Sequence, residues 1–66
     1  MERNIRLNWQ SLVEEAIKRR KEQRLTQEKL SVLAGVSKPT VNQFEQGKTS
    51  IAVGNVLKIL HILGLE

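Results

Sequence analysis

The sequence predicts an all-α fold, a compact domain of four to five short helices, and three observations lead to this prediction. Apolar residues recur at steps of three and four along most of the chain, as on a helix with one buried face. Glycines interrupt this pattern and are soon followed by residues that commonly begin a helix, as in AGVSKP at residues 34–39. Alternation typical of a strand is limited to Ile5, Leu7 and Trp9.

The length of the chain predicts one domain. Its 66 residues are close to the lower limit at which an apolar core alone supports folding. We expect residues 1–8 to form an N-terminal arm and residues 9–66 to form the folded domain. No apolar run reaches the roughly 18 residues of a membrane span, and no signal-peptide pattern opens the chain. We therefore expect a cytoplasmic protein with no membrane partner.

The first helix is predicted over residues 9–24, and Asn8 or Ser11 can cap its start. At 100° per residue one face collects apolar side chains, namely Trp9, Leu12, Val13, Ala16 and Ile17. Arg20 falls in the middle of this face. A buried arginine needs an anionic partner, because breaking a buried pair costs about 3–5 kcal/mol. The alternative is that Arg20 extends its charged end to solvent.

The remaining residues of the first helix suggest less specific roles. We expect Lys18, Arg19 and Lys21 to form a solvated face that pairs with nearby glutamates at helical spacing. We expect Trp9 to lie in the core or at an interface, because the sequence places no second aromatic residue near it.

The second and third helices are separated by a very short turn. The second is predicted over residues 27–34, with Thr26 as its N-cap. Gly35 is expected to end it in the left-handed region, which a β-carbon would disfavour. Ser37 caps the third helix, which is predicted over residues 37–46.

The fourth helix is predicted over residues 52–63, between the stops at Gly47 and Gly64. Six of its apolar residues share an arc of roughly 160° at 100° per residue, enough to face a core. They are Val53, Val56, Leu57, Ile59, Leu60 and Leu63. Ile62 and Leu65 lie outside the arc, so we expect them to be exposed.

Two short helices joined by a glycine turn form a helix-turn-helix. Where the two axes cross closely, Ser31 supplies the small side chain that this arrangement needs. Apolar residues are required between the helices, and the chain has Leu30, Val36, Val41 and Phe44 at those positions.

On these residues the chain resembles the helix-turn-helix of phage repressor and Cro proteins, also called Xre-like. The matching residues are Leu25-Thr26-Gln27-Glu28, Leu30-Ser31, Ala34-Gly35-Val36-Ser37, Thr40-Val41, Phe44-Glu45, Gly47-Lys48, Val56-Leu57-Lys58-Ile59-Leu60 and Leu63-Gly64. The resemblance extends over about residues 12–65. It implies a lambda-repressor-like fold and a DNA-binding domain, usually dimeric and usually a repressor, with the third helix in the major groove.

The resemblance also implies an ion pair between Arg20 and Glu45, which agrees with the place of Arg20 on the apolar face. The chain departs from the family pattern at three points. Pro39 stands where many members have a polar base-reading residue, so its contact would be apolar. Ile51 and Ala52 replace the proline and capping serine often found before the fourth helix. We expect no fifth helix within residues 64–66, although many phage repressors form their dimer interface with one.

We predict that the exposed arc of the third helix reads DNA bases. Asparagine and glutamine suit adenine edges, lysine suits guanine O6 and N7, and an apolar side chain can contact a thymine methyl group. The arc carries no acidic residue, whereas a plain solvated surface usually mixes acids with bases. The predicted base-reading residues are Lys38, Pro39, Asn42, Gln43 and Gln46.

Phosphate contacts are predicted at helix N-termini, where free N–H groups and the helix dipole attract anions. Thr26 and Gln27 stand at the start of the second helix, and Ser37 and Thr40 at the start of the third. Lys48 follows the third helix closely enough to reach the same backbone.

A homodimer is predicted to form through both ends of the chain. Ile62 and Leu65 would contribute exposed apolar surface near the C-terminus. Ile5 and Leu7 would pair as a short strand across a two-fold axis. The alternative for this arm is disorder up to Asn8.

Composition argues against catalysis. The chain has one histidine, no cysteine and no glycine-rich phosphate loop, so we predict no catalytic residues, no metal site and no cofactor. The net charge of +4 favours a polyanionic partner.

The function that these observations favour is sequence-specific binding of double-stranded DNA, with a palindromic operator as the partner of a dimeric repressor. A phage-type repressor, an antitoxin with a toxin partner and an operon autoregulator all fit this description. The alternative function is a protein-interaction or coactivator module that uses the same fold without reading bases.

Overall fold

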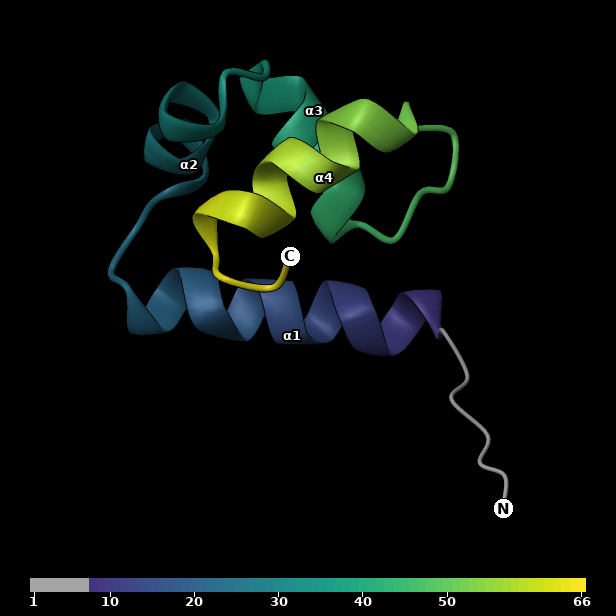
Figure 1. Cartoon of the computed structure of the whole chain (residues 1–66), viewed down its shortest axis with the longest axis horizontal. Coiled ribbons are helices and arrows are strands. Elements are labelled where there is room, and N and C mark those ends of the chain that lie inside the picture. The colour runs from purple at the N-terminus through teal and green to yellow at the C-terminus, as the bar shows by residue number, and fades with distance from the viewer. Residues whose placement is uncertain (1–7) are drawn as a thin grey trace.

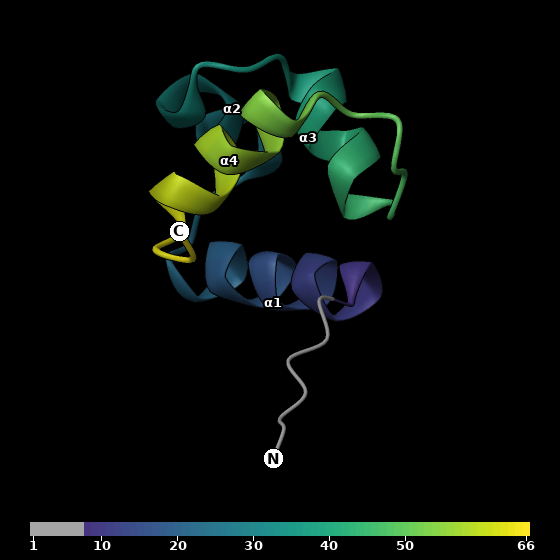
Figure 2. The same cartoon turned by 45° about the vertical axis from the view of Figure 1, so that its right-hand side comes forward.

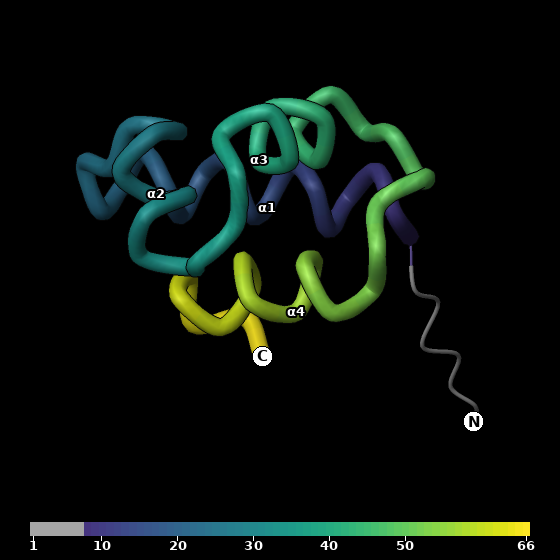
Figure 3. The backbone as a smooth tube through the Cα atoms, turned by 90° about the horizontal axis from the view of Figure 1, so that it is seen from above, coloured from purple at the N-terminus to yellow at the C-terminus, as the bar shows by residue number. Residues whose placement is uncertain are grey.

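A computed structural model describes residues 8–66 and shows four helices there, with no strand among these residues, which confirms the all-α prediction. The helices are α1 (Trp9–Glu22), α2 (Gln27–Ala34), α3 (Lys38–Glu45) and α4 (Val53–Ile62). Figure 1 shows α1 along one side of the molecule, with the other three helices packed together above it. Viewed from above, α4 lies along one side of the pair formed by α2 and α3 (Figure 3).

The start of α1 is held by a cap and by an aromatic contact. Asn8 is the N-cap, and its side chain accepts a hydrogen bond from the Ser11 N–H at 3.1 Å. The Trp9 ring meets Phe44 edge to face, with ring centroids 5.5 Å apart. Trp9 Nε1 also donates to the Gly47 carbonyl at 3.0 Å. A second aromatic therefore does lie beside Trp9, contrary to our expectation, because the fold brings it from a distant part of the sequence.

The end of α1 comes at Glu22, earlier than the predicted 9–24. Arg24 adopts a left-handed conformation with φ of 59°, and its N–H donates to the Lys21 carbonyl at 3.0 Å. The next N–H, of Leu25, donates to the Arg20 carbonyl at 3.0 Å. This is the usual end of a helix that closes on a glycine. The sequence does not reveal this helix end, because Arg24 occupies the left-handed position where a glycine is usual.

The core draws on all four helices, and it is small. Helix α4 contacts both α2 and α3, and α3 also contacts α1. Ser31 is buried, and its hydroxyl donates to the Glu28 carbonyl at 2.6 Å. The buried apolar residues are Val13, Ala16, Leu30, Val41, Phe44, Val56, Ile59, Leu60 and Leu63.

The exposed apolar residues of α4 differ from those that the helical arc predicts. Val53 and Leu57, which the arc places in the core, are 73% and 44% exposed. Ile62 and Leu65 are half-buried and pack against the core, so their expected exposure is wrong. The C-terminal end of α4 is the end nearest to α1 (Figure 1, Figure 2). Neither residue is thus the free apolar surface on which the dimer prediction rests.

The chain reverses after α4 and returns toward α1. Gly64 has φ of +76°, and Leu65 beyond it packs against the core. Arg19 secures this reversal, because its Nη1 donates to the carbonyls of Leu63 at 3.3 Å and Gly64 at 3.1 Å. The same guanidinium pairs with Glu15 at 3.2 Å. Pairing with a nearby glutamate was expected of Arg19, but its role in fixing the C-terminal residues was not.

Arg24→Gly should stabilise the domain, because glycine adopts the left-handed conformation without the steric cost that a β-carbon carries. We expect a gain of about 1 kcal/mol in the free energy of unfolding, or roughly 4–8 °C in Tm for a domain of this size. Thermal melts followed by circular dichroism measure it.

The matched control is Lys21→Gly, which also replaces an exposed cation near the end of α1. Lys21 has helical geometry, so glycine there should cost about 1 kcal/mol. Equal destabilisation by both changes would show that Arg24 is not strained.

Candidate nucleic-acid interface

The turn between α2 and α3 is built by Gly35 and Ser37, as predicted. Gly35 has φ of 74°, and its N–H donates to the Ser31 carbonyl at 2.9 Å. Ser37 is the N-cap of α3, and its Oγ accepts a hydrogen bond from the Thr40 N–H at 3.2 Å. Both helix ends are thereby satisfied within a few residues. The short turn leaves α3 little freedom to rotate against α2.

One face of α3 is buried completely and the opposite face is free. Val41 and Phe44 have no exposed surface and fix which side of the helix meets the core. The side chains on the other face can donate and accept hydrogen bonds, and none of them is acidic. Five exposed residues make up this face: Lys38, Pro39, Asn42, Gln43 and Gln46. They are the residues that the sequence predicts to read bases, and their base contacts remain a prediction.

The N-terminus of α2 lies at the same edge of the molecule. Thr26 caps it, with Oγ1 accepting a hydrogen bond from the Lys29 N–H at 3.0 Å. The N–H groups of Gln27 and Glu28, in the first turn, have no acceptor within the helix. They are available to an anion, as the sequence predicts for this position.

The other predicted phosphate-binding residues differ in whether their side chains already make hydrogen bonds within the protein. Lys48 is exposed. The hydroxyls of Ser37 and Thr40 lie 2.7 Å apart and share a hydrogen bond, in addition to the capping bond. These two side chains are therefore engaged locally, and a phosphate would have to compete with that bond.

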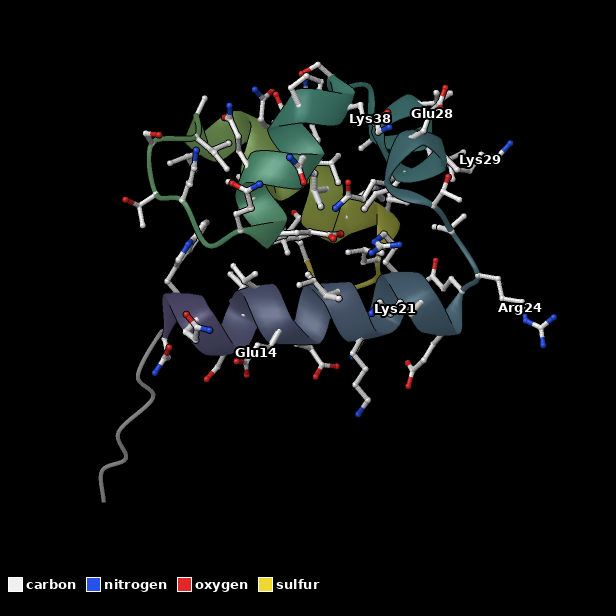
Figure 4. The ribbon with its side chains drawn as sticks, turned by 180° about the vertical axis from the view of Figure 1, so that it is seen from behind. Glu14, Lys21, Arg24, Glu28, Lys29 and Lys38 are labelled. Atoms are coloured by element: carbon white, nitrogen blue, oxygen red, sulfur yellow. The ribbon has the colours of Figure 1, made fainter. Side chains whose placement is uncertain are left out.

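An open hollow separates the starts of α2 and α3. Its volume is about 430 Å³, and Arg20, Thr26, Gln27, Glu28 and Lys38 line it. A second hollow of about 360 Å³ adjoins α3 and is lined by Gln27, Lys38, Pro39 and Asn42. Figure 4 shows the side chains of Lys38 and Glu28 at this edge. The acid-free face of α3 therefore borders one acidic residue, which comes from α2 and which the pattern of α3 could not reveal.

Behind this surface Arg20 and Glu45 form the ion pair that the resemblance implies, and the place of Arg20 on the apolar face of α1 agrees with it. Arg20 Nε donates to Glu45 Oε2 at 2.6 Å, and Nη2 donates to Oε1 at 3.1 Å. The side chains are 13% and 8% exposed. Arg20 Nη1 also donates to the Leu25 carbonyl at 2.8 Å, and Gln27 Nε2 donates to Glu45 Oε1 at 2.8 Å. The pair therefore connects α1, the turn after it, α2 and α3.

The side chain of Gln27 has a partner within the protein that the sequence analysis does not predict. The sequence places it at a helix N-terminus as a phosphate ligand, and the structure engages its side chain with Glu45 as well. No sequence signal identifies this bond, because the two residues belong to different helices. The predicted dimer residues Ile5 and Leu7 lie outside the described residues.

Residues 8–66 contain neither a metal-binding cluster nor a membrane-spanning helix. Across that range the structure shows no cluster of three or more histidine, cysteine, aspartate or glutamate residues that could hold a metal ion. In the same range no helix is both long and apolar enough to cross a membrane.

Comparison with known proteins agrees with this geometry. A family model described as helix-turn-helix, of the Cro/C1 type, matches residues 17–66. The match covers more than half of the chain and includes α2, the turn, α3 and α4. No curated protein matches the chain.

Glu45→Ala should destabilise the domain strongly, because it leaves the mostly buried Arg20 without its acidic partner. We expect a loss of about 3–5 kcal/mol, which is a large part of the stability of a small domain. The double variant Arg20→Met/Glu45→Leu should recover most of the loss, because it leaves no unpaired charge. Urea denaturation measures both.

Glu15→Ala serves as the control, because it removes the acidic partner of Arg19 in an ion pair whose side chains are 39% and 43% exposed. An exposed pair of this kind is worth less than about 1 kcal/mol. A Glu45→Ala protein as stable as Glu15→Ala would mean that the buried pair contributes no more than a surface pair.

Proposed function

The chain belongs to the Cro/C1-type helix-turn-helix family of DNA-binding transcription regulators, and from that premise we propose that it is a dimeric repressor that reads a specific duplex sequence with α3. The family is regulatory and not typically enzymatic. The observation that carries the proposal is the free face of α3, where five exposed residues without an acid oppose a fully buried apolar face.

The proposed contacts divide into two kinds. Side chains on the free face of α3 contact base edges in the major groove, which gives sequence preference. The N-terminus of α2 and Lys48 contact phosphates, which gives affinity but no preference. The starts of α2 and α3 share one edge of the molecule, which supports simultaneous contact with the groove and the adjacent backbone.

The dimer that we propose uses α4 in place of the contacts predicted from the sequence. Val53 and Leu57 are four residues apart, so they lie on one face of the helix, and both are exposed. A second copy packed there across a two-fold axis would cover them. Such a dimer would set the two recognition helices about 34–36 Å apart and favour a palindromic operator.

The alternative is a protein-interaction module that does not read bases. Val32 and Leu33 favour it, because they place 70% and 49% exposed apolar side chains next to each other on α2. A toxin that covers these residues would make the chain an antitoxin and would be compatible with DNA binding through α3. A phage-type repressor or an operon autoregulator requires no such partner.

Gln43→Ala should reduce sequence discrimination, because it removes one predicted base contact from the free face of α3. We expect a loss of about 1–3 kcal/mol at one base position and little change on unrelated DNA. Fluorescence titration against a duplex selected from a randomised pool, and against a scrambled duplex, measures this.

Lys48→Ala is the paired variant. It should weaken binding to both duplexes and reduce the slope of log K against log salt by about 1, because it removes one phosphate contact. Equal losses on the two duplexes for Gln43→Ala would contradict base reading by that residue and would favour the interaction module.

Val53→Lys should weaken dimerisation, because it introduces a charge in the centre of the proposed contact. Sedimentation velocity over micromolar concentrations should show a shift from dimer toward monomer. Val32→Lys is the matched control, because Val32 is 70% exposed and Val53 is 73% exposed. The proposed dimer would be contradicted if the wild-type protein is a monomer and also binds its duplex as one copy. It would equally be contradicted if Val32→Lys, and not Val53→Lys, shifts the protein toward monomer.

A further inference from the structure

The peptide unit that joins Gly47 to Lys48 is held by a hydrogen bond at each end. Its N–H group, which belongs to Lys48, donates to the Gln43 carbonyl at 3.2 Å. Its carbonyl group, which belongs to Gly47, accepts a hydrogen bond from Trp9 Nε1 at 3.0 Å. A peptide unit is planar, so bonds at its two opposite edges fix the orientation of the whole plane. The backbone that carries the Lys48 side chain is therefore fixed relative to α3.

The bond from Lys48 to Gln43 belongs to the ending of α3 itself. Gly47 is left-handed, with φ of 84°, and its N–H donates to the Phe44 carbonyl at 3.0 Å. These two bonds are those of a helix that closes on a glycine. They satisfy carbonyls of the helix, and the Gly47 carbonyl needs a donor from elsewhere. Helix α1 supplies that donor, from a residue 38 positions earlier in the chain.

The indole of Trp9 is itself held in place by the core. Its ring stands at 87° to the ring of Phe44, which has no exposed surface. The indole N–H group can only donate, so its bond to the Gly47 carbonyl has one direction. The start of α1 lies at the same end of the molecule as the loop after α3 (Figure 1, Figure 2). Trp9 thus joins α1 to this loop through one directed bond.

We propose that Trp9 is a positioning residue for the phosphate contact of Lys48: its bond to Gly47 holds the Lys48 backbone where the ammonium group meets the DNA backbone. The inference rests on the proposed function, which gives Lys48 that contact. Lys48 is exposed, and a long side chain loses conformational freedom on binding, so a backbone that is already fixed lowers the cost of the contact. Because the Lys48 N–H bonds to Gln43, the same peptide unit also sets the distance between a phosphate contact and a predicted base contact.

Trp9→Phe tests this role, because it keeps a ring against Phe44 and removes the donor. Titrations at a temperature where every variant is folded compare a labelled duplex selected from a randomised pool with a scrambled one. Trp9→Phe should weaken binding to both duplexes equally, by about two- to tenfold, the equilibrium factor that one neutral hydrogen bond is worth. The loss should not exceed that of Lys48→Ala. In the Lys48→Ala background, Trp9→Phe should weaken binding no further.

Amide hydrogen exchange in the free protein provides a second measurement. Trp9→Phe should speed the exchange of the Lys48 N–H relative to amides within α2, because one of the two bonds that hold this peptide unit is lost. Asn8→Ala is the matched control, since it removes the cap of α1 next to Trp9 and leaves the bond to Gly47 in place. Asn8→Ala should lower Tm without weakening the binding of the folded protein to either duplex.

If Trp9→Phe does not fold, the 66-residue chain can be made by chemical synthesis with 3-benzothienylalanine at position 9. In this side chain a sulfur atom takes the place of the indole N–H group, and the shape is nearly that of tryptophan. The same titrations and the same exchange measurement then apply to the synthetic protein.

Three results would overturn the inference and leave the proposed function intact. The first is that Lys48→Ala weakens binding and loss of the Trp9 donor does not. The second is that loss of the donor weakens binding equally in the Lys48→Ala background, or mainly on the selected duplex, because Trp9 would then act through α3 as a whole. The third is that Lys48→Ala leaves affinity for both duplexes unchanged. A wild-type protein that binds both duplexes equally would contradict base reading alone, and one that binds neither would overturn both proposals.

Discussion

The ion pair between Arg20 and Glu45 is the interaction on which the arrangement of this domain depends. It joins the last turn of α1 to the last residue of α3 with two hydrogen bonds, and both side chains are almost fully buried. Two buried charges are tolerable only when each satisfies the other. Any rotation or sliding of α3 against α1 would separate them, so the pair holds α3 with one particular face toward the core and the opposite face toward solvent.

The rest of the fold compensates for a core that is small. Local features define where each helix begins and ends, such as the Thr26 and Ser37 caps and the left-handed Gly35. These features set element lengths without deciding how the elements pack. Long-range contacts do that, and α1 makes two more besides the ion pair: Trp9 Nε1 donates to the carbonyl of Gly47, and Arg19 donates to the carbonyls of Leu63 and Gly64 after α4. The first helix thus holds the rest of the chain at both of its ends.

In the candidate site, too, some features follow from local sequence and others depend on long-range contacts. The face of α3 could be predicted because one helix supplies all five residues, and periodicity decides which side of a helix is buried. The bond from Gln27 to Glu45, and the position of Glu28 beside Lys38, involve residues from separate helices. Periodicity within a helix carries no information about such neighbours. The exposed apolar residues of α4 were misplaced for a related reason, since a helical wheel cannot show that Ile62 packs against the core and that Val53 stays exposed.

The sequence by itself determined the helical class, the glycine turn, the caps and the polar face of α3. Each of these follows from the conformational preferences of a few adjacent residues or from the 3.6-residue period of a helix. It also indicated that Arg20 needs an anionic partner, because a cation on an apolar face demands an anion, and the resemblance implied that this partner is Glu45. Only the tertiary structure decided that the same anion orients Gln27, that Phe44 lies against Trp9 and that Leu65 returns to the core. These contacts join segments that are far apart in the chain. They are determined by the packing of all four helices and by the need to pair buried charges.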